Sequence, residues 1–469
     1  MNDSAFKTKV TRRKFLAAAG AAIAMPTIIP LSALGRGGKT APSERVTVGV
    51  VGWGWQGPDD TRACLPLPNC QVVAACDLDT DHLKDALDTM NGFYHNKDCK
   101  GYHDFREMMA RPDIDAVILA VPDHWHALVA IEAANHKKDI YGEKPLAKTI
   151  TEQQAIVHAV ERNNRIWQTG SWQRSVANFH KAAEIVRNGY IGEITHVEVG
   201  LPSGHADFMK TGQYTTPSAP PPELDYETWI GPAKMMPYIR ARIHRNWRWN
   251  YNTGGGQLMD WIGHHCDIAH WGMDADNSGP YEVEGHGDFP PEDAVWNTCT
   301  KYRIELKYPK NITMTIAGGY PEIRSGTKWI GTEGWVWVDR SGFEGSKPEW
   351  NDYKELPEEM RKVKLYSSSN HRKNFIDCVI SRQPTITPVQ TAHHSAIPGH
   401  LGLISMLVGR KLRWDVASER ILDDHEATRL MGRPYRAPWK LPGNGPTHLA
   451  LSPKQMAEKA RGNFTGISD

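Results

Sequence analysis

Residues 46–77 read VTVGVVGWGWQGPDDTRACLPLPNCQVVAACD, and this stretch decides the fold. It opens with a valine-rich run, Val46 to Val51, of the kind that forms a buried parallel strand. A glycine-rich turn, a segment able to form a helix and a second apolar run, Gln71 to Cys76, follow in that order. Asp77 ends the unit. This order is typical of a Rossmann βαβ unit.

The turn, Gly52-Trp53-Gly54-Trp55-Gln56-Gly57, has the spacing G-x-G-x-x-G. Its first glycine permits a tight turn, its second lets a pyrophosphate approach the backbone, and its third lets helix and strand pack closely. The phosphates would bind free N–H groups at the helix N-terminus. Asp77 stands where a carboxylate binds the adenosine ribose and disfavours a 2′-phosphate, so we predict NAD rather than NADP. The cofactor contacts expected from this unit are Gly52, Gly54, Trp55, Gln56, Gly57 and Asp77.

The composition narrows the class of protein. The chain has 469 residues, enough for two or three domains. Its formal net charge is +1 and no long run of one sign occurs, so nothing points to a nucleic-acid or anionic-membrane partner. The seven cysteines lack C-x-x-C spacing, and we expect ordinary buried thiols rather than a disulfide framework or a zinc site.

The first 35 residues have the pattern of a targeting segment. Thr11-Arg12-Arg13-Lys14-Phe15-Leu16 precedes an apolar run, Ala17 to Met25, that is too short to span a membrane stably. The pattern resembles a twin-arginine export signal; the alternative is a basic tail followed by a membrane anchor. We expect a signal peptide at 1–35, a polar linker at 36–44, and a periplasmic or otherwise exported protein. The resemblance implies export in the folded state, which fits a protein that acquires a cofactor first.

Strand and helix patterns alternate up to about Gly170, which predicts an α/β domain at 45–170 with a doubly wound parallel sheet. The loop Pro122-Asp123-His124-Trp125-His126 follows a buried strand, and ligands bind beyond the carboxyl ends of such strands. We expect this loop to form one wall of the nicotinamide pocket; a proline turn with Asp123 as helix N-cap is compatible with that role. The next strand leads into Gly142-Glu143-Lys144-Pro145.

The glycine turn, the loop 122–126 and Glu143-Lys144-Pro145 together resemble the Gfo/Idh/MocA oxidoreductases, which include glucose–fructose oxidoreductase and inositol dehydrogenases. The resemblance continues through Gln168-Thr169-Gly170-Ser171 and through GGGQLMDWIGHHCD at 254–267, and it covers most of 45–440. It implies a second, α+β domain at 171–440 with an open, mostly antiparallel sheet, often the face of a homo-oligomer. The further cofactor contacts expected from it are Pro122, His126, Glu143 and Lys144.

The second half of the chain is compatible with that architecture. Alternating patterns indicate strands at Trp296 to Leu306, Ile312 to Ala317 and Trp329 to Val338. A helix of about 15 residues is expected to follow Gly254-Gly255-Gly256 and to end near Gly272. A proline-rich, weakly patterned insertion precedes it, and the polar tail 441–469 is expected to be loosely ordered.

Three residues carry the predicted chemistry. Asp260 and His264 are four residues apart on the expected helix, so they share a face. His264 can take the proton of a secondary hydroxyl, because histidine titrates near neutrality. Asp260 can orient the ring or bind a neighbouring hydroxyl. Lys144 can steady the developing alkoxide and contact the nicotinamide ribose. The family resemblance assigns the same roles to this lysine, aspartate and histidine.

Several assignments stay open at this point. Ile262 stands where many relatives have glycine, so the packing of the helix, and with it whether His264 or His265 faces the pocket, stays open. We prefer His264, because it shares a helix face with Asp260 and His265 lies about 100° further round the helix. Arg248, in a tryptophan-rich run, is either a sugar-facing donor or part of a packed aromatic loop. A metal site of His264, His265, Asp267 and His270, or a set of core histidines, is the competing interpretation, and we expect no metal. The expected substrate contacts are Lys144, Arg174, Arg248, Asp260, His264 and His265.

Three functions fit this pattern. The first is hydride transfer between a sugar, cyclitol or glycoside hydroxyl and a tightly bound nicotinamide cofactor. The second is redox-neutral glycoside cleavage, in which a sugar carbon is oxidised, the aglycone is eliminated and the hydride returns; export favours it, because free NAD is not recycled outside the cytoplasm. The third is a non-catalytic sugar- or nucleotide-binding protein, which the presence of both Lys144 and His264 makes least favoured.

Overall fold

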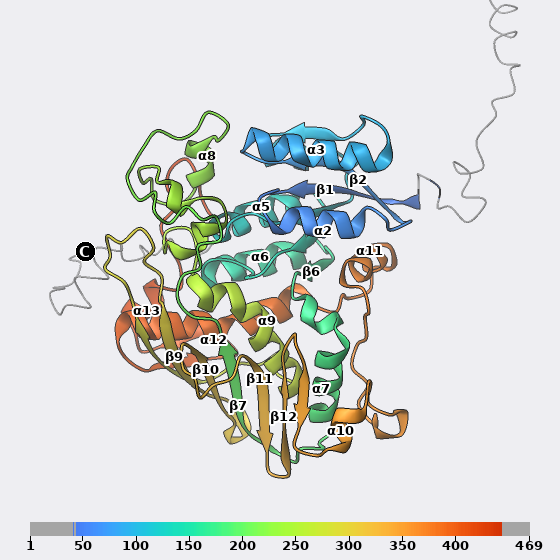
Figure 1. The fold of residues 1–469 in the computed structure, drawn as a ribbon, viewed down its shortest axis with the longest axis vertical. Helices are drawn as coiled ribbons and strands as arrows, with labels where there is room; N and C mark the ends of the chain where they lie inside the picture. The colour runs from blue at the N-terminus through green and yellow to red at the C-terminus, as the bar shows by residue number, and fades with distance from the viewer. Residues whose placement is uncertain (1–40, 42–43, 443–469) are drawn as a thin grey trace, which may run out of the picture. The chain divides into compact units, whose positions relative to one another are not determined.

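The computed structural model describes residues 41 and 44–442. The predicted signal peptide 1–35, nearly all of the linker 36–44 and most of the tail 441–469 lie outside the described residues. Within the described part, two sheets are present, one of six strands and one of nine (Figure 1). No helix among the described residues is both long and apolar enough to cross a membrane. All seven cysteines are free and buried, as predicted.

The six-stranded sheet is parallel throughout and has the strand order β3-β2-β1-β4-β5-β6. The predicted Rossmann sheet is thereby confirmed. The order reverses between β1 and β4, and in such sheets ligands bind at this switch point beyond the carboxyl ends of the strands. The strands are β1 (Val46–Val51), β2 (Cys70–Cys76), β3 (Lys100–Tyr102), β4 (Ala116–Leu119), β5 (Asp139–Gly142) and β6 (Trp167–Thr169).

The helices of this domain begin where polar side chains satisfy their first N–H groups. Asp79 accepts hydrogen bonds from the backbone N–H groups of Asp81 and His82, and Thr149 accepts one from Glu152. These caps fix where the helices start relative to the strand ends that carry the site. The helices are α2 (Gln56–Cys64), α3 (Thr80–Tyr94), α4 (Phe105–Met109), α5 (His126–Asn135) and α6 (Ile150–Arg162).

The nine-stranded sheet is mostly antiparallel, as predicted, and only β7 and β10 pair in parallel. Its order is β13-β12-β11-β7-β10-β9-β8-β14-β15. The strands are β7 (Ile194–Leu201), β8 (Glu282–Asp288), β9 (Lys301–Lys307), β10 (Thr313–Gly318), β11 (Gly326–Gly331), β12 (Gly334–Val338), β13 (Phe343–Gly345), β14 (Leu412–Asp415) and β15 (Arg420–Leu422).

Two predicted strands are wrong in their extent. The segment Trp296 to Leu306 forms a strand only from Lys301, as β9, because Asn297 and Thr298 donate their N–H groups to the Trp249 carbonyl instead of to a strand. Trp329 to Val338 was expected to be a single strand, but it holds the end of β11, a turn at Thr332-Glu333, and β12, which pair as an antiparallel hairpin. Alternation continues across the two-residue turn, so the pattern alone does not reveal the reversal. Strands β8, β13 and β15 were not predicted.

Helices α7 (Ala177–Arg187), α9 (Gly256–Met273) and α12 (Val389–Val408) pack against the nine-stranded sheet, and α12 also contacts α6. Figure 1 shows α9 and α12 between the two sheets. The remaining helices are α8 (Tyr226–Ile230), α10 (Glu349–Asp352), α11 (His371–Ser381) and α13 (His425–Arg429). Helix α11 returns to the first domain and contacts α2 and β1.

The insertion between β7 and α9 reaches back to the nucleotide domain. The Thr80 N–H donates to the Glu223 carbonyl at 2.9 Å, and the Asp225 N–H donates to the Leu78 carbonyl at 3.2 Å. The Trp229 carbonyl, in α8, accepts the indole N–H of Trp125 at 2.9 Å. The insertion is therefore attached at the carboxyl-end edge of the first sheet, where the site lies.

Candidate functional site

A cavity of about 880 Å³ opens at the carboxyl ends of the Rossmann strands. Its volume lies in the upper part of the range for ligand pockets. The glycine turn, Asp77, the loop 122–126, Lys144 and the N-terminal half of α9 all contribute to its walls. The insertion contributes Phe208, Arg245 and Arg248 from the opposite side.

The glycine turn has the geometry that a dinucleotide requires. Gly52 has φ +93°, and a Cβ there would lie 2.4 Å from the Ala120 carbonyl oxygen. A Cβ on Gly57 would lie 1.9 Å from the Gly52 carbonyl oxygen, so only glycine lets α2 begin here. Gly54, by contrast, is exposed with its nearest neighbour 3.9 Å from a built Cβ. No side chain of the described residues caps the N-terminus of α2, and Trp55 and Gln56 at this terminus line the cavity, so the N-terminus is available to an anionic group.

Asp77 is held in place by two backbone groups. Its Oδ2 accepts the Trp53 N–H at 2.6 Å and its Oδ1 accepts the Asp79 N–H at 2.9 Å. Each oxygen keeps a lone pair for a further donor. The carboxylate therefore lies in a fixed orientation at the end of β2, on the wall of the cavity.

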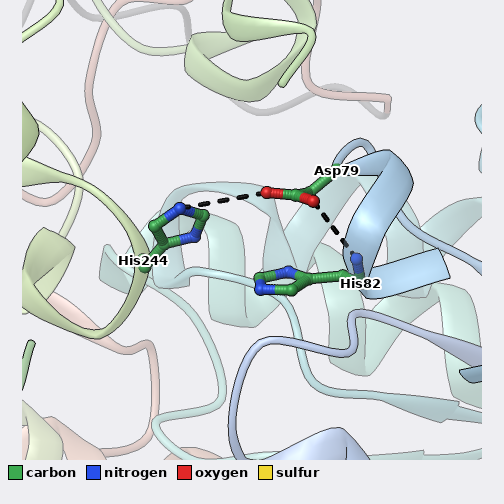
Figure 2. Close-up of side chains that lie close together, drawn as sticks. All are labelled: Asp79, His82 and His244. Carbon is green, nitrogen blue, oxygen red and sulfur yellow. Dashed lines mark hydrogen bonds and ion pairs between the residues drawn. The ribbon is translucent and has the colours of Figure 1, made fainter. Parts of the chain in front are cut away.

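Beside Asp77, a cluster of Asp79, His82 and His244 joins the nucleotide domain to the insertion (Figure 2). His244 Nε2 lies 3.9 Å from Asp79 Oδ2, and the two imidazole rings meet edge to face with centroids 5.1 Å apart. Burial lowers the pKa of His82, but its hydrogen bond to Asp77 and the nearby carboxylates outweigh burial and raise it. Burial lowers the pKa of His244.

Lys144 and Asp260 meet at the other end of the cavity. The Lys144 ammonium donates to the Asp260 carbonyl at 2.6 Å and to Asp260 Oδ1 at 3.0 Å, and Arg248 Nε donates to the same Oδ1 at 2.8 Å. Burial alone would raise the pKa of Asp260, but the two cations outweigh it and hold that pKa well below its usual range. Asp260 is therefore ionised at neutral pH, and its low pKa makes it a poor proton acceptor.

His264 lies on the same face of α9 as Asp260 and lines the cavity. Burial, followed by the charges of Lys144 and Arg340, lowers its pKa well below the ordinary value. His264 is thus a neutral base at pH 7. Among the described residues, its Nδ1 has no hydrogen-bond partner.

The neighbouring His265 was predicted as a substrate contact, and the structure does not bring it to the cavity. Its Nδ1 lies 2.8 Å from the Gly200 carbonyl in β7, and burial lowers its pKa to about 4. Of the two histidines, only His264 lines the cavity.

Gly263 follows Ile262, the position where the family resemblance led us to expect a glycine. A Cβ at Gly263 would lie 2.9 Å from Lys144 Cβ, so this glycine lets α9 pack directly on the lysine. Ile262 instead turns toward α12, where a Cβ on Gly399 would lie 2.8 Å from Ile262 Cγ1. The Ser171 hydroxyl donates to the Gly263 carbonyl at 2.6 Å and holds this part of α9 to the end of the first domain.

Arg174 requires a correction. It was predicted as a substrate contact, but it does not line the cavity. The guanidinium is buried and donates to Asp267 (Nε to Oδ2, 2.8 Å) and to Asp276 (Nη2 to Oδ1, 2.7 Å). A buried arginine needs such carboxylate partners, and here two of them occupy its donors. Asp267 is thereby also removed from the alternative metal set, and His270 of that set contacts the Tyr308 hydroxyl at 2.8 Å.

The other predicted contacts of the nucleotide domain that line the cavity are Trp55, Gln56, Pro122, His126 and Glu143, and the last two are held by close packing. His126 has Nδ1 2.7 Å from the Pro145 carbonyl and Nε2 2.9 Å from the Val121 carbonyl, which joins the loop 122–126 to the lysine-bearing segment. Glu143 fits only because Gly170 has no side chain, since a Cβ there would lie 2.1 Å from Glu143 Oε1. Burial and then Asp60 raise the pKa of Glu143 well above its ordinary value.

Sequence reasoning missed the rim beside His264. Trp172, Trp261 and Arg340 line the cavity, and the Arg340 guanidinium lies over both rings, 4.7 Å from the centroid of Trp172 and 4.5 Å from that of Trp261. These residues come from three separate elements. No local motif could have grouped them, although the high tryptophan content was a general signal.

Comparison with known proteins identifies the family. The oxidoreductase-family NAD-binding Rossmann fold matches residues 46–171, and the oxidoreductase-family C-terminal alpha/beta domain matches residues 175–441. Inositol 2-dehydrogenase of Salmonella paratyphi B is 29% identical over 193 residues, which is 41% of this chain and 53% of that protein. Glycosyl hydrolase family 109 protein 2 of Shewanella sp. strain ANA-3 is 30% identical over 161 residues, 33% of this chain and 35% of that protein. The match thus spans about half of the first relative's length and a third of the second's.

A solved structure shows the same fold. The WlbA dehydrogenase from Chromobacterium violaceum, in complex with NADH and UDP-GlcNAcA, superposes with a TM-score of 0.59 at 18% identity, covering 79% of this chain and 96% of that one. At this identity the likeness concerns the fold alone. The two family models follow one another along most of the described chain, and they show that the chain belongs to the Gfo/Idh/MocA oxidoreductase family.

Proposed function

We propose that the protein is an NAD-dependent oxidoreductase that transfers hydride between a secondary hydroxyl of a sugar, cyclitol or glycoside and a tightly held nicotinamide cofactor. One observation carries the proposal. Lys144, Asp260 and His264, from two domains, converge in the same cavity as the glycine turn and Asp77. A cavity with the nucleotide features at one end and a base beside a cation at the other is suited to oxidise an alcohol.

The bound nicotinamide would accept the hydride from the carbinol carbon. The chain's residues supply the rest of the reaction. Neutral His264 takes the hydroxyl proton, and the Lys144 ammonium stabilises the negative charge that develops on the oxygen. Asp260 holds the lysine at 3.0 Å and is itself held by Arg248, so the ammonium is oriented before the substrate arrives.

NAD is favoured over NADP by the Asp77 carboxylate, which would repel a 2′-phosphate. Tight binding is favoured by the insertion. Arg245 and Arg248 lie over the Trp55 ring of the glycine turn at 4.7 and 5.1 Å, and Phe208 meets that ring at 5.0 Å. These side chains would lie beside a dinucleotide bound at the glycine turn and would slow its release. We further propose export through the twin-arginine-type signal and a homo-oligomer.

The variant Lys144→Met tests the assignment. Turnover of any accepted sugar or cyclitol should fall by about a thousandfold, because one preorganised charge is typically worth that much. Affinity for NAD, measured by calorimetry, should stay within about tenfold, since Asp77 and the glycine turn are untouched. Lys84→Met, which removes an exposed lysine of α3 outside the cavity, is the control and should keep turnover. Near-normal turnover of Lys144→Met would refute the site.

A second candidate is redox-neutral cleavage of a glycoside. The likeness to a glycosyl hydrolase family 109 protein and the enclosing insertion favour it. In that cycle the carbinol carbon is oxidised, the proton on the adjacent carbon is lost, the aglycone leaves, water adds, and the hydride returns. Solvent deuterium at the adjacent carbon of the product would support this candidate, and its absence during confirmed cleavage would exclude elimination.

A further inference from the structure

We propose that Arg340 reads an acidic group, so that the preferred substrate is a sugar acid with a carboxylate rather than a neutral sugar. The proposal rests on the function proposed above and specifies its substrate class. It starts from the position of one guanidinium. Arg340 follows β12, lines the cavity beside His264, and lies over the rings of Trp172 and Trp261 at 4.7 and 4.5 Å.

The other cations at this end already have carboxylate partners. Lys144 and Arg248 both contact Asp260 Oδ1, at 3.0 and 2.8 Å. Arg340 forms no ion pair with any described residue, and its one hydrogen bond is a long contact of 3.4 Å from Nη2 to Gln173 Oε1. The guanidinium therefore has unused N–H donors next to the catalytic residues.

The adjacent Asp339 does not fill this place. Its Oδ1 accepts hydrogen bonds from the Ser341 N–H, the Ser341 hydroxyl and the Gly342 N–H, so the carboxylate closes its own turn. Asp260 in turn is committed to Lys144 and Arg248. Three cations, Lys144, Arg248 and Arg340, thus stand beside one carboxylate, Asp260, at the catalytic end of the cavity.

The geometry suits a planar anion. Stacking on the two indole rings fixes the plane of the guanidinium and leaves its N–H edge for a ligand. A carboxylate matches two parallel N–H donors of arginine, which a hydroxyl cannot do. The charge of Arg340 also reaches His264 and contributes to its lowered pKa. An anion bound at Arg340 would therefore lie close to the base, within reach of one sugar ring.

The experiment uses the full chain loaded with NAD and three pairs of probes that differ only at C6: glucuronate and glucose, galacturonate and galactose, mannuronate and mannose. Binding is measured by calorimetry at low and high salt. At least one acid should bind about ten- to a hundredfold more tightly than its neutral partner, because charge-assisted hydrogen bonds have that worth. High salt should reduce this ratio.

Three variants make the test specific. Arg340→Met should abolish the acid-to-neutral ratio while leaving neutral-sugar binding unchanged, and Arg340→Lys should restore part of it. Arg324→Met is the matched control: it removes an arginine stacked on Trp337 at 3.2 Å, outside the cavity, and should keep the ratio. If Arg340 served only to stabilise the fold, the Arg340→Met variant would have a lower unfolding temperature but the same acid-to-neutral ratio of affinities.

Two outcomes overturn the proposal: equal affinities for every acid and its neutral partner, or no binding of any probe by protein that binds NAD. A failure of the proposed function looks different. In that case, Lys144→Met leaves the turnover of a neutral sugar unchanged, or NAD does not bind at all, whatever stands at position 340.

Discussion

Gly263→Ala would test whether the packing of α9 sets the position of Lys144. The added Cβ would lie 2.9 Å from Lys144 Cβ, whereas ordinary contacts are 3.4–4 Å, so helix and lysine must separate by about 0.5–1 Å. Overpacking of this size costs about 1–3 kcal/mol of stability. A displacement of about 1 Å in a catalytic group costs about a hundredfold in rate.

We therefore expect kcat/KM of Gly263→Ala to fall about 30- to 100-fold, with NAD affinity nearly unchanged. The assay is steady-state turnover together with calorimetric NAD binding and thermal unfolding. Gly272→Ala is the matched control on the same helix. Its Cβ would lie 2.6 Å from Trp329 Cε2, far from the lysine, so it should lose similar stability and keep its kcat/KM within about threefold.

Two results would refute this reasoning. The first is a Gly263→Ala variant that loses stability and keeps full kcat/KM, because the lysine position would then not depend on the helix contact. The second is an equal loss of kcat/KM in Gly272→Ala, because general loosening of α9 would then explain the effect.

Three further predictions follow from the site. Asp77→Asn should weaken NAD binding by about 1.5–3 kcal/mol and should reduce the preference for NAD over NADP, both measured by calorimetry with the two nucleotides. An unchanged preference for NAD would count against a contact between Asp77 and the ribose. The acid limb of the pH profile of kcat/KM for alcohol oxidation should lie well below pH 6.5, because the base must be neutral and burial lowers the pKa of His264. The charge of Lys144 also lowers this pKa, so Lys144→Met should move the acid limb to higher pH. Urea unfolding of Arg174→Met should show a loss of about 3–5 kcal/mol of unfolding free energy, because Asp267 and Asp276 would lose their buried partner, while the KM for the substrate stays unchanged. A raised KM would instead show that Arg174 contacts the substrate.

The cofactor end of the site was predictable from the sequence because its parts are local. A glycine turn between a strand and a helix, with an acid at the next strand end, fixes its own geometry within one βαβ unit. The pairing of Asp260 with His264 likewise follows from helix periodicity. Of these residues, Asp77, Asp260, His264 and four residues of the turn line the cavity, namely Gly52, Gly54, Trp55 and Gln56. Gly57, which was predicted as a cofactor contact, does not line it and instead packs against Gly52.

Features that depend on tertiary packing could not be predicted. The sequence gives no sign that Arg174 and Arg340 have different roles. Arg174 is buried between Asp267 and Asp276, whereas Arg340 lies exposed on two tryptophan rings at the cavity rim. The partners that decide each role come from distant elements. Thr332-Glu333 is not a typical hairpin turn dipeptide, so the reversal within 329–338 also left no local signal.

The most direct test of the central claim is to measure the nucleotide that the protein carries. Protein purified without added cofactor is denatured, and the supernatant is assayed for nicotinamide nucleotide by mass and absorbance. A cavity lined by the glycine turn, Asp77 and side chains of the insertion predicts about one NAD or NADH per chain, if the cofactor is held as tightly as we propose. No released nucleotide, together with weak calorimetric binding of added NAD, would contradict the account.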